Sequence, residues 1–354
     1  MDTSDECATG STEFGAGQHG GQVMLLGIDI GFGFSKTITR LGADVFPSVV
    51  GDWTPAEFQI GSFDRTDHDA VGYEGRRYLV GERALKLASR LFVGLSREWL
   101  DTVPYRILAL NAIRRRLPES GLSVTVVTGL PVGDITQHVA TVKRRLEGTH
   151  RLEILAAGRP WEVTISDVRV LPQPLGTVFS QVMDDHGNLT DARLVEARIG
   201  VLDIGFRTSD YFTLQGFEVI PAQCLTRNTG IAELLLDVSR EIGSRYGVET
   251  DPHALNDVVL RKKLPVGSRT IDITSIVEPL LDRHAEAILA HGRMLWGDEA
   301  RGLHVLWMTG GGAQLLDARL QQLAPHATLV ANARIQNAVG YYRFGCHLAK
   351  QARK

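Results

Sequence analysis

A pattern of strand, turn and strand opens the part of the chain that is rich in apolar residues. Residues 23–28 are an apolar run of strand length that ends at Asp29, and strand character resumes at residues 34–38. Gly31 and Gly33 mark the turn between the two strands. Because glycine has no Cβ, the backbone N–H groups of such a turn can converge on phosphate oxygens. The pattern predicts a phosphate-binding turn, with a plain hairpin as the alternative.

Three side chains at this turn suit the same chemistry. Ser35 provides a hydroxyl and Lys36 provides a cation, and both groups can contact phosphate oxygens. Asp29, at the end of the first strand, is placed to hold the water molecules that surround a metal ion. These residue types suit a phosphate and metal site, but glycine-rich turns between strands are common, so this pattern by itself is weak evidence against a plain hairpin.

The second half of the chain repeats the pattern. Residues 199–214 again read as a strand, then Asp203, Gly205 and Thr208, and then a further strand. An aspartate and a glycine, separated by one residue, thus follow a buried strand in each half. A repeated unit of this kind predicts two similar domains that face one another.

A third element follows later in the chain. Residues 305–316 read as a strand that ends in the glycines 310–312, with a helix that begins at about Ala313. The N-terminus of that helix is electropositive and suits a nucleotide. The sequence thus predicts two phosphate loops and one nucleoside loop.

The remaining apolar patterns predict further helices and strands. Asp134 is expected to cap one of the helices at its N-terminus. The expected helices are residues 98–117, 134–146, 231–242, 255–264 and 273–296, and the expected strands include residues 123–130 and a hairpin over residues 71–82.

Four polar clusters are open to a functional and a structural interpretation. The basic triplets 114–116 and 143–145 could meet DNA, but cations at a helix C-terminus also favour the helix dipole. Residues 67–69 (Asp-His-Asp) could bind a metal ion, but adjacent residues in one loop rarely converge on one ion. Residues 261–263 could reach a ribose or lie in solvent. We favour the structural interpretation for each cluster.

Composition narrows the class of protein. The chain has 354 residues, of which 44% are hydrophobic and 22% charged, so its length favours two domains. The net charge of −3 does not suggest a protein that coats nucleic acid, and no segment is apolar for long enough to span a membrane. Cys7, Cys224 and Cys346 are far apart, as expected for reduced thiols in a cytoplasmic protein. Residues 1–22 are expected to be a disordered tail without the features of a signal peptide.

The order of these motifs resembles the actin-like ATPase superfold, and within it the ParM/StbA-type plasmid segregation proteins and archaeal actin-like relatives. The resemblance covers nearly the whole chain from Met24 onward. It rests on the three loops together with residues 73–82, 126–132, 170–176 and 331–333.

The resemblance implies an α/β fold of the actin type, which is ribonuclease H-like and duplicated, with a nucleotide cleft between two domains. Each domain is expected to contain a mixed five-stranded sheet. Domain I would span residues 23–170, with a small inserted subdomain at about 46–97, and domain II would span 171–330. Residues 331–354 would form a C-terminal helix that returns to domain I.

The resemblance also implies the roles of individual residues. Gln173 matches a residue that aligns the attacking water, although its place between two prolines would also suit a surface turn. Asp29 and Asp203 would be catalytic and would hold Mg²⁺ through its water molecules, with ATP or GTP as the nucleotide. The residues expected to bind the nucleotide are Gly31, Gly33, Ser35, Lys36, Gly205, Thr208, Asp210, Thr229, Gly230, Gly310, Gly311 and Gly312.

The function implied is slow ATP hydrolysis coupled to the assembly of filaments that segregate plasmid DNA or position cargo. The expected partners are further copies of the chain and a DNA-bound adaptor protein, with no membrane and no direct sequence-specific binding of nucleic acid. A small-molecule kinase of the same superfold is one alternative, but it needs a carboxylate where Gln173 stands. The other alternative is a nucleotide-dependent chaperone or reactivase, which normally carries a large extra substrate-binding region.

Overall fold

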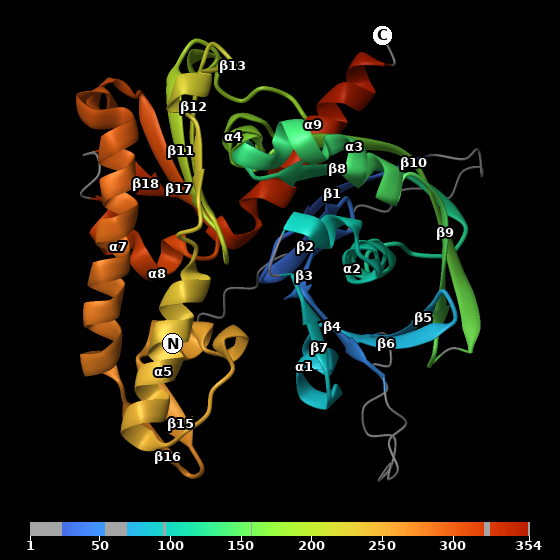
Figure 1. The fold of residues 1–354 in the computed structure, drawn as a ribbon. Helices are drawn as coiled ribbons and strands as arrows, with labels where there is room; N and C mark the ends of the chain where they lie inside the picture. Colours follow the sequence, from blue (N-terminus) through green and yellow to red (C-terminus); the bar gives the residue numbers. More distant parts are fainter. Residues whose placement is uncertain (1–22, 54–68, 95–96, 157, 322–325, 353–354) are drawn as a thin grey trace, which may run out of the picture.

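The computed structural model describes residues 23–53, 69–94, 97–156, 158–321 and 326–352, and these form two sheets with helices around them (Figure 1). The first sheet is mixed and contains ten strands. In spatial order they are β3 (Gly42–Pro47), β2 (Phe34–Thr39), β1 (Met24–Ile30), β8 (Leu122–Leu130), β10 (Arg159–Pro172), β9 (Gly148–Ile154), β5 (Ala70–Tyr73), β6 (Arg76–Val80), β4 (Val49–Asp52) and β7 (Leu91–Val93).

The second sheet contains six strands and comes from the second half of the chain. Its order is β13 (Glu218–Val219), β12 (Ser209–Gln215), β11 (Arg198–Ile204), β17 (Val305–Thr309) and β18 (Ala327–Leu329), and β14 (Leu225–Arg227) pairs with β12. A separate hairpin joins β15 (Lys263–Val266) to β16 (Arg269–Asp272).

The two sheets share one local topology. In the first sheet β1 pairs antiparallel with β2 and parallel with β8, and in the second sheet β11 pairs antiparallel with β12 and parallel with β17. The expected duplicated α/β fold is therefore confirmed. The expectation of five strands in each sheet is wrong, because β5 pairs with β9 and so joins the inserted strands to the first sheet.

Helices on the first sheet are α1 (Glu82–Leu87), α2 (Val103–Arg114) and α3 (Ile135–Leu146). The helix expected at residues 98–117 is shorter, because Thr102 accepts a hydrogen bond from the Tyr105 N–H and begins α2 there, with a proline in its first turn. Asp134 precedes α3, but its side chain makes no capping hydrogen bond, so that expectation is wrong. It lines the cleft described below.

Helices of the second half are α4 (Gln173–Val182), α5 (Ile231–Tyr246), α6 (Asn256–Arg261), α7 (Thr274–Trp296), α8 (Ala313–Leu320) and α9 (Gln336–Gln351). The side chains of α5, α7 and α8 share an apolar core with one face of the second sheet. The helix expected at residues 255–264 ends at Arg261 and gives way to β15. The sequence did not predict α4, where a proline follows the first residue and a glycine interrupts the apolar pattern.

Helices α4 and α9 cross at close range between the two sheets (Figure 1). A Cβ on Gly340 would overlap the carbonyl oxygen of Gly176 and lie 2.8 Å from the backbone nitrogen of Ser180. Helix α9 also crosses β1, since a Cβ on Gly27 would lie 2.5 Å from the backbone nitrogen of Tyr342. The last helix therefore contacts both the first sheet and α4, while the domain boundary at residue 170 stays a prediction.

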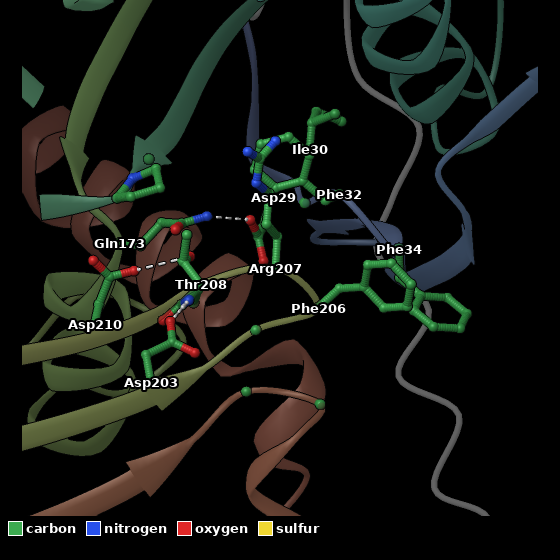
Figure 2. A pocket seen from close by; sticks show the side chains of 18 of the residues that line it. Asp29, Ile30, Phe32, Phe34, Gln173, Asp203, Phe206, Arg207, Thr208 and Asp210 are labelled. Carbon is green, nitrogen blue, oxygen red and sulfur yellow. Dashed lines mark hydrogen bonds between the residues drawn. The ribbon is translucent and has the colours of Figure 1, made fainter. Parts of the chain in front are cut away.

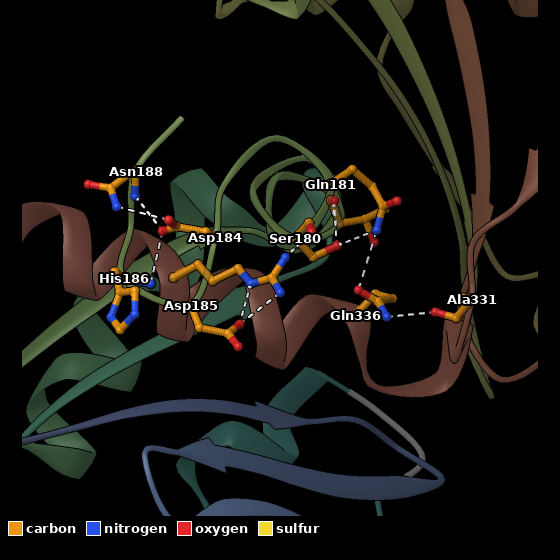
Figure 3. A network of polar contacts seen from close by, with 10 residues as sticks. Ser180, Gln181, Asp184, Asp185, His186, Asn188, Ala331 and Gln336 are labelled. Atoms are coloured by element: carbon orange, nitrogen blue, oxygen red, sulfur yellow. Dashed lines mark hydrogen bonds and ion pairs between the residues drawn. The ribbon is translucent and has the colours of Figure 1, made fainter. Parts of the chain in front are cut away.

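Polar contacts extend this crossing along α9 (Figure 3). Gln181 donates to the side-chain carbonyl of Gln336 at 3.4 Å, and Gln336 donates to the carbonyl of Ala331 at 2.6 Å. At the other end, Arg343 donates to Asp185 at 2.8 Å. The bond between Gln181 and Gln336 joins the two helices directly, and Arg343 ties α9 to the segment that follows α4.

The first basic triplet forms contacts within the protein. Arg115 bonds to Asp44 at 2.6 Å and to Asp69 at 2.8 Å, and Arg114 is buried. Asp67 and His68 lie outside the described residues. The structural interpretation therefore holds for Asp69, whose carboxylate is a partner of Arg115.

The second triplet forms ion pairs on the surface, and so does Lys262 from the basic residues 261–263. Arg145 bonds to Asp101 at 2.5 Å, and Lys262 forms an ion pair with Glu278. Cys224 and Cys346 are free thiols, and Cys7 lies outside the described residues. Among the helices that the structure describes, none combines the length and the apolar character that crossing a membrane requires.

Candidate functional site

A cleft lies between the two sheets, where strands β1, β11 and β17 end (Figure 2). It contains about 990 Å³ of space that protein atoms do not fill, a volume that includes open solvent at its mouth. Asp29 lines it from the first sheet and Asp203 from the second, and Gln173 reaches it from the first turn of α4. Residues far apart in the sequence therefore meet in one cavity, as the repeated motif predicted.

The two aspartate loops have the same backbone geometry. The N–H of Gly31 donates to the carbonyl of Phe34 at 3.1 Å, and the N–H of Gly205 donates to the carbonyl of Thr208 at 2.8 Å. Each glycine thus closes a tight turn at the end of its strand. The match shows that the repeat in the sequence is a repeat in space.

Asp29 is buried and has a partner on each carboxylate oxygen. Lys36, its neighbour across the β1–β2 pair, donates to Oδ2 at 2.7 Å, and the amide nitrogen of Gln173 donates to Oδ1 at 3.2 Å. A carboxylate only accepts, so the amide group of Gln173 must face Asp29. Its carbonyl oxygen is therefore the part of the side chain that can accept a hydrogen bond from water.

Asp203 is buried on the opposite side of the cleft. The amide nitrogen of Asn337, from α9, donates to its Oδ2 at 2.6 Å. Burial raises the pKa of Asp203 from 3.8 to about 6, and the bond from Asn337 and the charge of Asp29 act on it more weakly, in opposite directions. A cation beside this carboxylate would favour its charged form.

Asp210 is the cross-strand neighbour of Asp203, at the position that Lys36 holds opposite Asp29. The backbone N–H of Val132 donates to its Oδ1 at 3.1 Å, and the hydroxyl of Thr226 donates to the same atom. The pKa of Asp210 is raised from 3.8 to about 7, mainly by burial and in part by the nearby Asp203, while the hydrogen bonds from Thr226 and Val132 lower it. The second sheet therefore places two acids where the first sheet places an acid and a base.

Backbone constraints explain the glycine at the end of β17. Gly310 has a φ of +87°, and a Cβ there would overlap the carbonyl oxygen of Ile204 and a carboxylate oxygen of Asp203. Gly310 and Gly311 line the cleft. Gly312 lies behind them, where its N–H donates to the carbonyl of Ile204 at 2.9 Å.

Four of the expected nucleotide-binding residues lie outside the lining of the cleft, namely Ser35, Thr229, Gly230 and Gly312. Ser35 is buried and hydrogen-bonds Ser48 at 2.9 Å, because alternate residues of β2 face opposite sides of the sheet. Thr229 and Gly230 lie behind the second loop, where the N–H of Gly230 donates to the carbonyl of Arg207 at 2.9 Å. They support the loop from behind. The other expected residues line the cleft: Asp29, Gly31, Gly33, Lys36, Gln173, Asp203, Gly205, Thr208, Asp210, Gly310 and Gly311.

Sequence reasoning missed several polar residues of the cleft, including Asn256 and Arg334. Asp134 and Asn337 line it together with Arg207. A closer comparison of the two repeats could have found Arg207, which lies within the second loop. Asp134 and Asn337 had no comparable sequence pattern, since they come from the starts of different helices.

The residues of the cleft fit a nucleotide with Mg²⁺. Mg²⁺ in nucleotide sites is usually held by one or two carboxylates, water and phosphate oxygens. Asp29 and Asp203 supply two buried carboxylates, and among the described residues no group of three or more His, Cys, Asp or Glu could hold a metal ion by itself. The donor set thus suits an ion that arrives with phosphate better than a resident metal.

Each half of the chain matches the model of an actin-like family. Residues 27–176 match the N-terminal domain of actin-like proteins, and residues 201–322 match the C-terminal part of the MreB-like archaeal actin homologue. The two matches include both aspartate loops. The chain therefore belongs to the actin-like proteins.

Individual relatives extend over nearly the whole chain. An archaeal actin homolog of Thermoplasma volcanium is 22% identical over 340 residues, which are 90% of this chain and 98% of that protein. The crystal structure of an archaeal actin homolog in complex with ADP has a TM-score of 0.74 and 18% identity, and covers 94% of this chain and 100% of that chain. A 15-stranded ParM filament from Clostridium botulinum has a TM-score of 0.75 and 20% identity, and covers 91% of this chain and 99% of that chain. At these identities the two structures show a common fold.

Proposed function

We propose that this chain hydrolyses a nucleoside triphosphate, ATP or GTP, in the cleft and couples hydrolysis to assembly of copies of itself. The observation that carries the proposal is the contact between Gln173 and Asp29, at a cleft lined by two equivalent aspartate loops. A relative of the same fold binds ADP, and another forms a filament. We propose nucleotide binding and filament assembly for this chain as well.

The chain's own residues would divide the work as follows. Asp29 and Asp203 would hold Mg²⁺ through its water shell, and the ion would neutralise charge on the phosphates when it is bound. The turns at Gly31 and Gly205 would bring backbone close to the phosphates. Lys36, which is paired with Asp29, would contribute positive charge near the phosphates.

Gln173 would set the rate of the chemical step. Its carbonyl oxygen would orient a water molecule, which attacks the terminal phosphorus while the bond to the nucleoside diphosphate breaks. An amide cannot take up the proton of the water, so catalysis would depend on positioning and charge, and hydrolysis would be slow. A kinase of the same fold would need a carboxylate at this place.

The cellular role belongs to the same proposal. Filaments of this chain would segregate plasmid DNA or position another cargo, with a DNA-bound adaptor protein as the link. We expect the site of action to be the cytoplasm. The support is the fold shared with a ParM filament and the membership of the actin-like proteins.

Light scattering and hydrolysis measured on the same preparation test this function. We expect scattering to rise with ATP or GTP and Mg²⁺, to rise less with ADP, and to stay at baseline without nucleotide. Asp203→Ala should abolish hydrolysis because the cleft loses a buried carboxylate, whereas Asp282→Ala, at an exposed aspartate, should leave hydrolysis unchanged.

Three results would contradict the proposal. Hydrolysis that persists in Asp203→Ala would show that the reaction does not depend on the proposed site. Hydrolysis that requires an added small hydroxyl compound would indicate the kinase alternative. Nucleotide binding without any assembly, together with capture of an unfolded polypeptide, would indicate the chaperone alternative.

A further inference from the structure

The second loop carries an arginine at a position where the first loop carries a glycine. Both loops begin Asp-Ile-Gly-Phe, at residues 29–32 and 203–206, and they diverge at Gly33 and Arg207. A Cβ on Gly33 would lie 2.8 Å from the ring of Phe206, so the first loop needs a glycine to let the second loop approach. The equivalent position of the two loops is therefore a glycine that provides space in the first loop and a cation in the second loop.

Arg207 lines the cleft, and its charge is not balanced by an ion pair with any residue that the structure describes (Figure 2). Its Nη1 is buried and has no hydrogen-bond partner within the described part of the chain. The guanidinium lies 5.2 Å from the ring centroid of Phe32 in the first loop. By contrast, Lys36 is engaged by Asp29 at 2.7 Å. A buried donor without a partner is costly, which favours a site that an anion completes.

Stacking on Phe32 leaves Arg207 free to bind an anion. A guanidinium stacks through its flat face, whereas its N–H groups point outward in the plane of the group. Those N–H groups form a rigid fork that matches two oxygens of a phosphate. Phe32 therefore acts as a positioning residue that fixes the plane of the fork without using its donors.

The place of Arg207 in the cleft indicates which phosphate it meets. It lies between Asp203 and Thr208 in the second loop and contacts the first loop through Phe32, so it stands where the two phosphate-binding turns approach one another. Arg334 is another cation of the cleft, but it lies beside Gly311, where a Cβ would be 3.9 Å from its side chain. That glycine belongs to the loop assigned to the nucleoside.

We infer that Arg207 binds the terminal phosphate of a nucleoside triphosphate and stabilises the charge that builds up on that phosphate during transfer. This inference rests on the proposed function, because it needs a nucleotide in the cleft. An arginine so placed supplies two parallel donors to oxygens that gain charge in the transition state. Because only the triphosphate has this phosphate, the second loop would bind the triphosphate more tightly than the diphosphate.

Binding of two nucleotides to Arg207→Ala provides the direct test. A non-hydrolysable triphosphate analogue and ADP are titrated calorimetrically into the full-length protein and the variant, both with Mg²⁺. We expect triphosphate affinity to fall by about tenfold to a hundredfold, the effect of one charge-assisted bond, while ADP affinity changes little. The rate constant for hydrolysis should fall by roughly a hundredfold or more, and free guanidinium ions should restore part of it.

Three further variants separate binding from packing. Arg207→Lys should keep part of the triphosphate affinity and little of the rate, because an ammonium lacks the planar fork. Phe32→Leu should have a smaller effect than Arg207→Ala. Arg77→Ala removes an arginine that stacks on Trp53 at 4.8 Å outside the cleft, and it should change neither affinity nor rate.

Each other outcome has a definite meaning. If the unaltered protein binds neither nucleotide, the proposed function fails before Arg207 is tested. If it binds both and Arg207→Ala binds both equally well, the inference about Arg207 is wrong while the site stands. Equal losses for ADP and triphosphate, or a Phe32→Leu variant as poor as Arg207→Ala, would show that Arg207 only braces the two loops.

Discussion

The crossing of α4 and α9 allows one substitution to be worked through in detail. Gly340→Ala would place a methyl group against the backbone of α4, 2.5 Å from the carbonyl carbon of Gly176 and 2.8 Å from the nitrogen of Ser180. Ordinary contacts begin at about 3.4 Å, and the carbonyl oxygen of Gly176 is closer still, so the helices would have to separate by more than about 1 Å. Backbone atoms cannot rotate away from the methyl group as a side chain could. The overlap therefore has to be relieved by moving a helix.

Two effects of opposite sign decide the magnitude. Alanine is favoured over glycine inside a helix by about 1 kcal/mol. Overpacking costs about 1–3 kcal/mol where side chains can adjust, and more where they cannot. The steric effect is the larger one, and we expect Gly340→Ala to lower the free energy of unfolding by about 2–3 kcal/mol net.

Urea unfolding at constant pH measures this effect, and the chain offers a matched control. Gly243 lies inside α5, where the nearest atom to an added Cβ is 3.8 Å away. Gly243→Ala should therefore stabilise the protein by about 0.5–1 kcal/mol. A Gly340→Ala variant as stable as the unaltered protein would refute the close crossing, and a destabilised Gly243→Ala would refute the assumption about helix preference.

The same substitution should also disturb the cleft. Helix α4 begins with Gln173, which contacts Asp29, and α9 carries Asn337, which contacts Asp203. Each pair joins a residue of one helix to a residue of a sheet. A shift of either helix by roughly 1 Å would therefore lengthen at least one of these hydrogen bonds beyond its normal range. We expect hydrolysis to fall in Gly340→Ala even at temperatures where the variant is folded.

Two further predictions concern the cleft itself. Gln173→Ala should slow hydrolysis by about tenfold to a thousandfold with nucleotide affinity nearly unchanged, and filaments should then persist longer; rapid hydrolysis would contradict the role of Gln173. Burial raises the pKa of Asp210 from 3.8 to about 7, so the folded protein keeps a proton there that the unfolded chain releases. Its contribution to stability is complete below pH 3.8 and is lost as the pH rises through about 7, a change of the order of 4 kcal/mol. Asp210→Asn should flatten this pH dependence in urea unfolding, and a slope equal to that of the unaltered protein would count against it.

The sequence predicted the paired loops well because they depend on local patterns. A buried strand, an aspartate and a glycine at fixed spacing specify the turn at residues 29–33 and again at residues 203–208. The helix from Ala313 and the hairpin around Glu74 follow from similarly local patterns, and the structure contains both. The spacing of apolar residues and the residue types at the turns were sufficient to predict these elements.

Other features could not be predicted because they depend on tertiary contacts. Helix α4 has a proline at its second residue and Gly176 in its interior, which suggest a loop until the crossing with α9 explains the glycine. Ser35 is placed away from the cleft by the alternation of β2, which a phosphate-loop pattern does not consider. The ten-stranded sheet depends on the pairing of β5 with β9, two segments about eighty residues apart.

The differences between the two repeats carry more information about chemistry than their similarities. Opposite Asp29 the first sheet places Lys36, which forms an ion pair with that carboxylate, whereas opposite Asp203 the second sheet places Asp210. Burial is the main cause that raises the pKa of both acids, and the charge of Asp203 raises the pKa of Asp210 further toward the neutral form. In the proposed function, the side of the cleft with Asp203 and Asp210 would therefore gain more from a bound cation than the side with Asp29 and Lys36. Arg207 lies in the loop between these two acids. The second repeat therefore contains both the two buried carboxylates and the side chain proposed to bind the terminal phosphate.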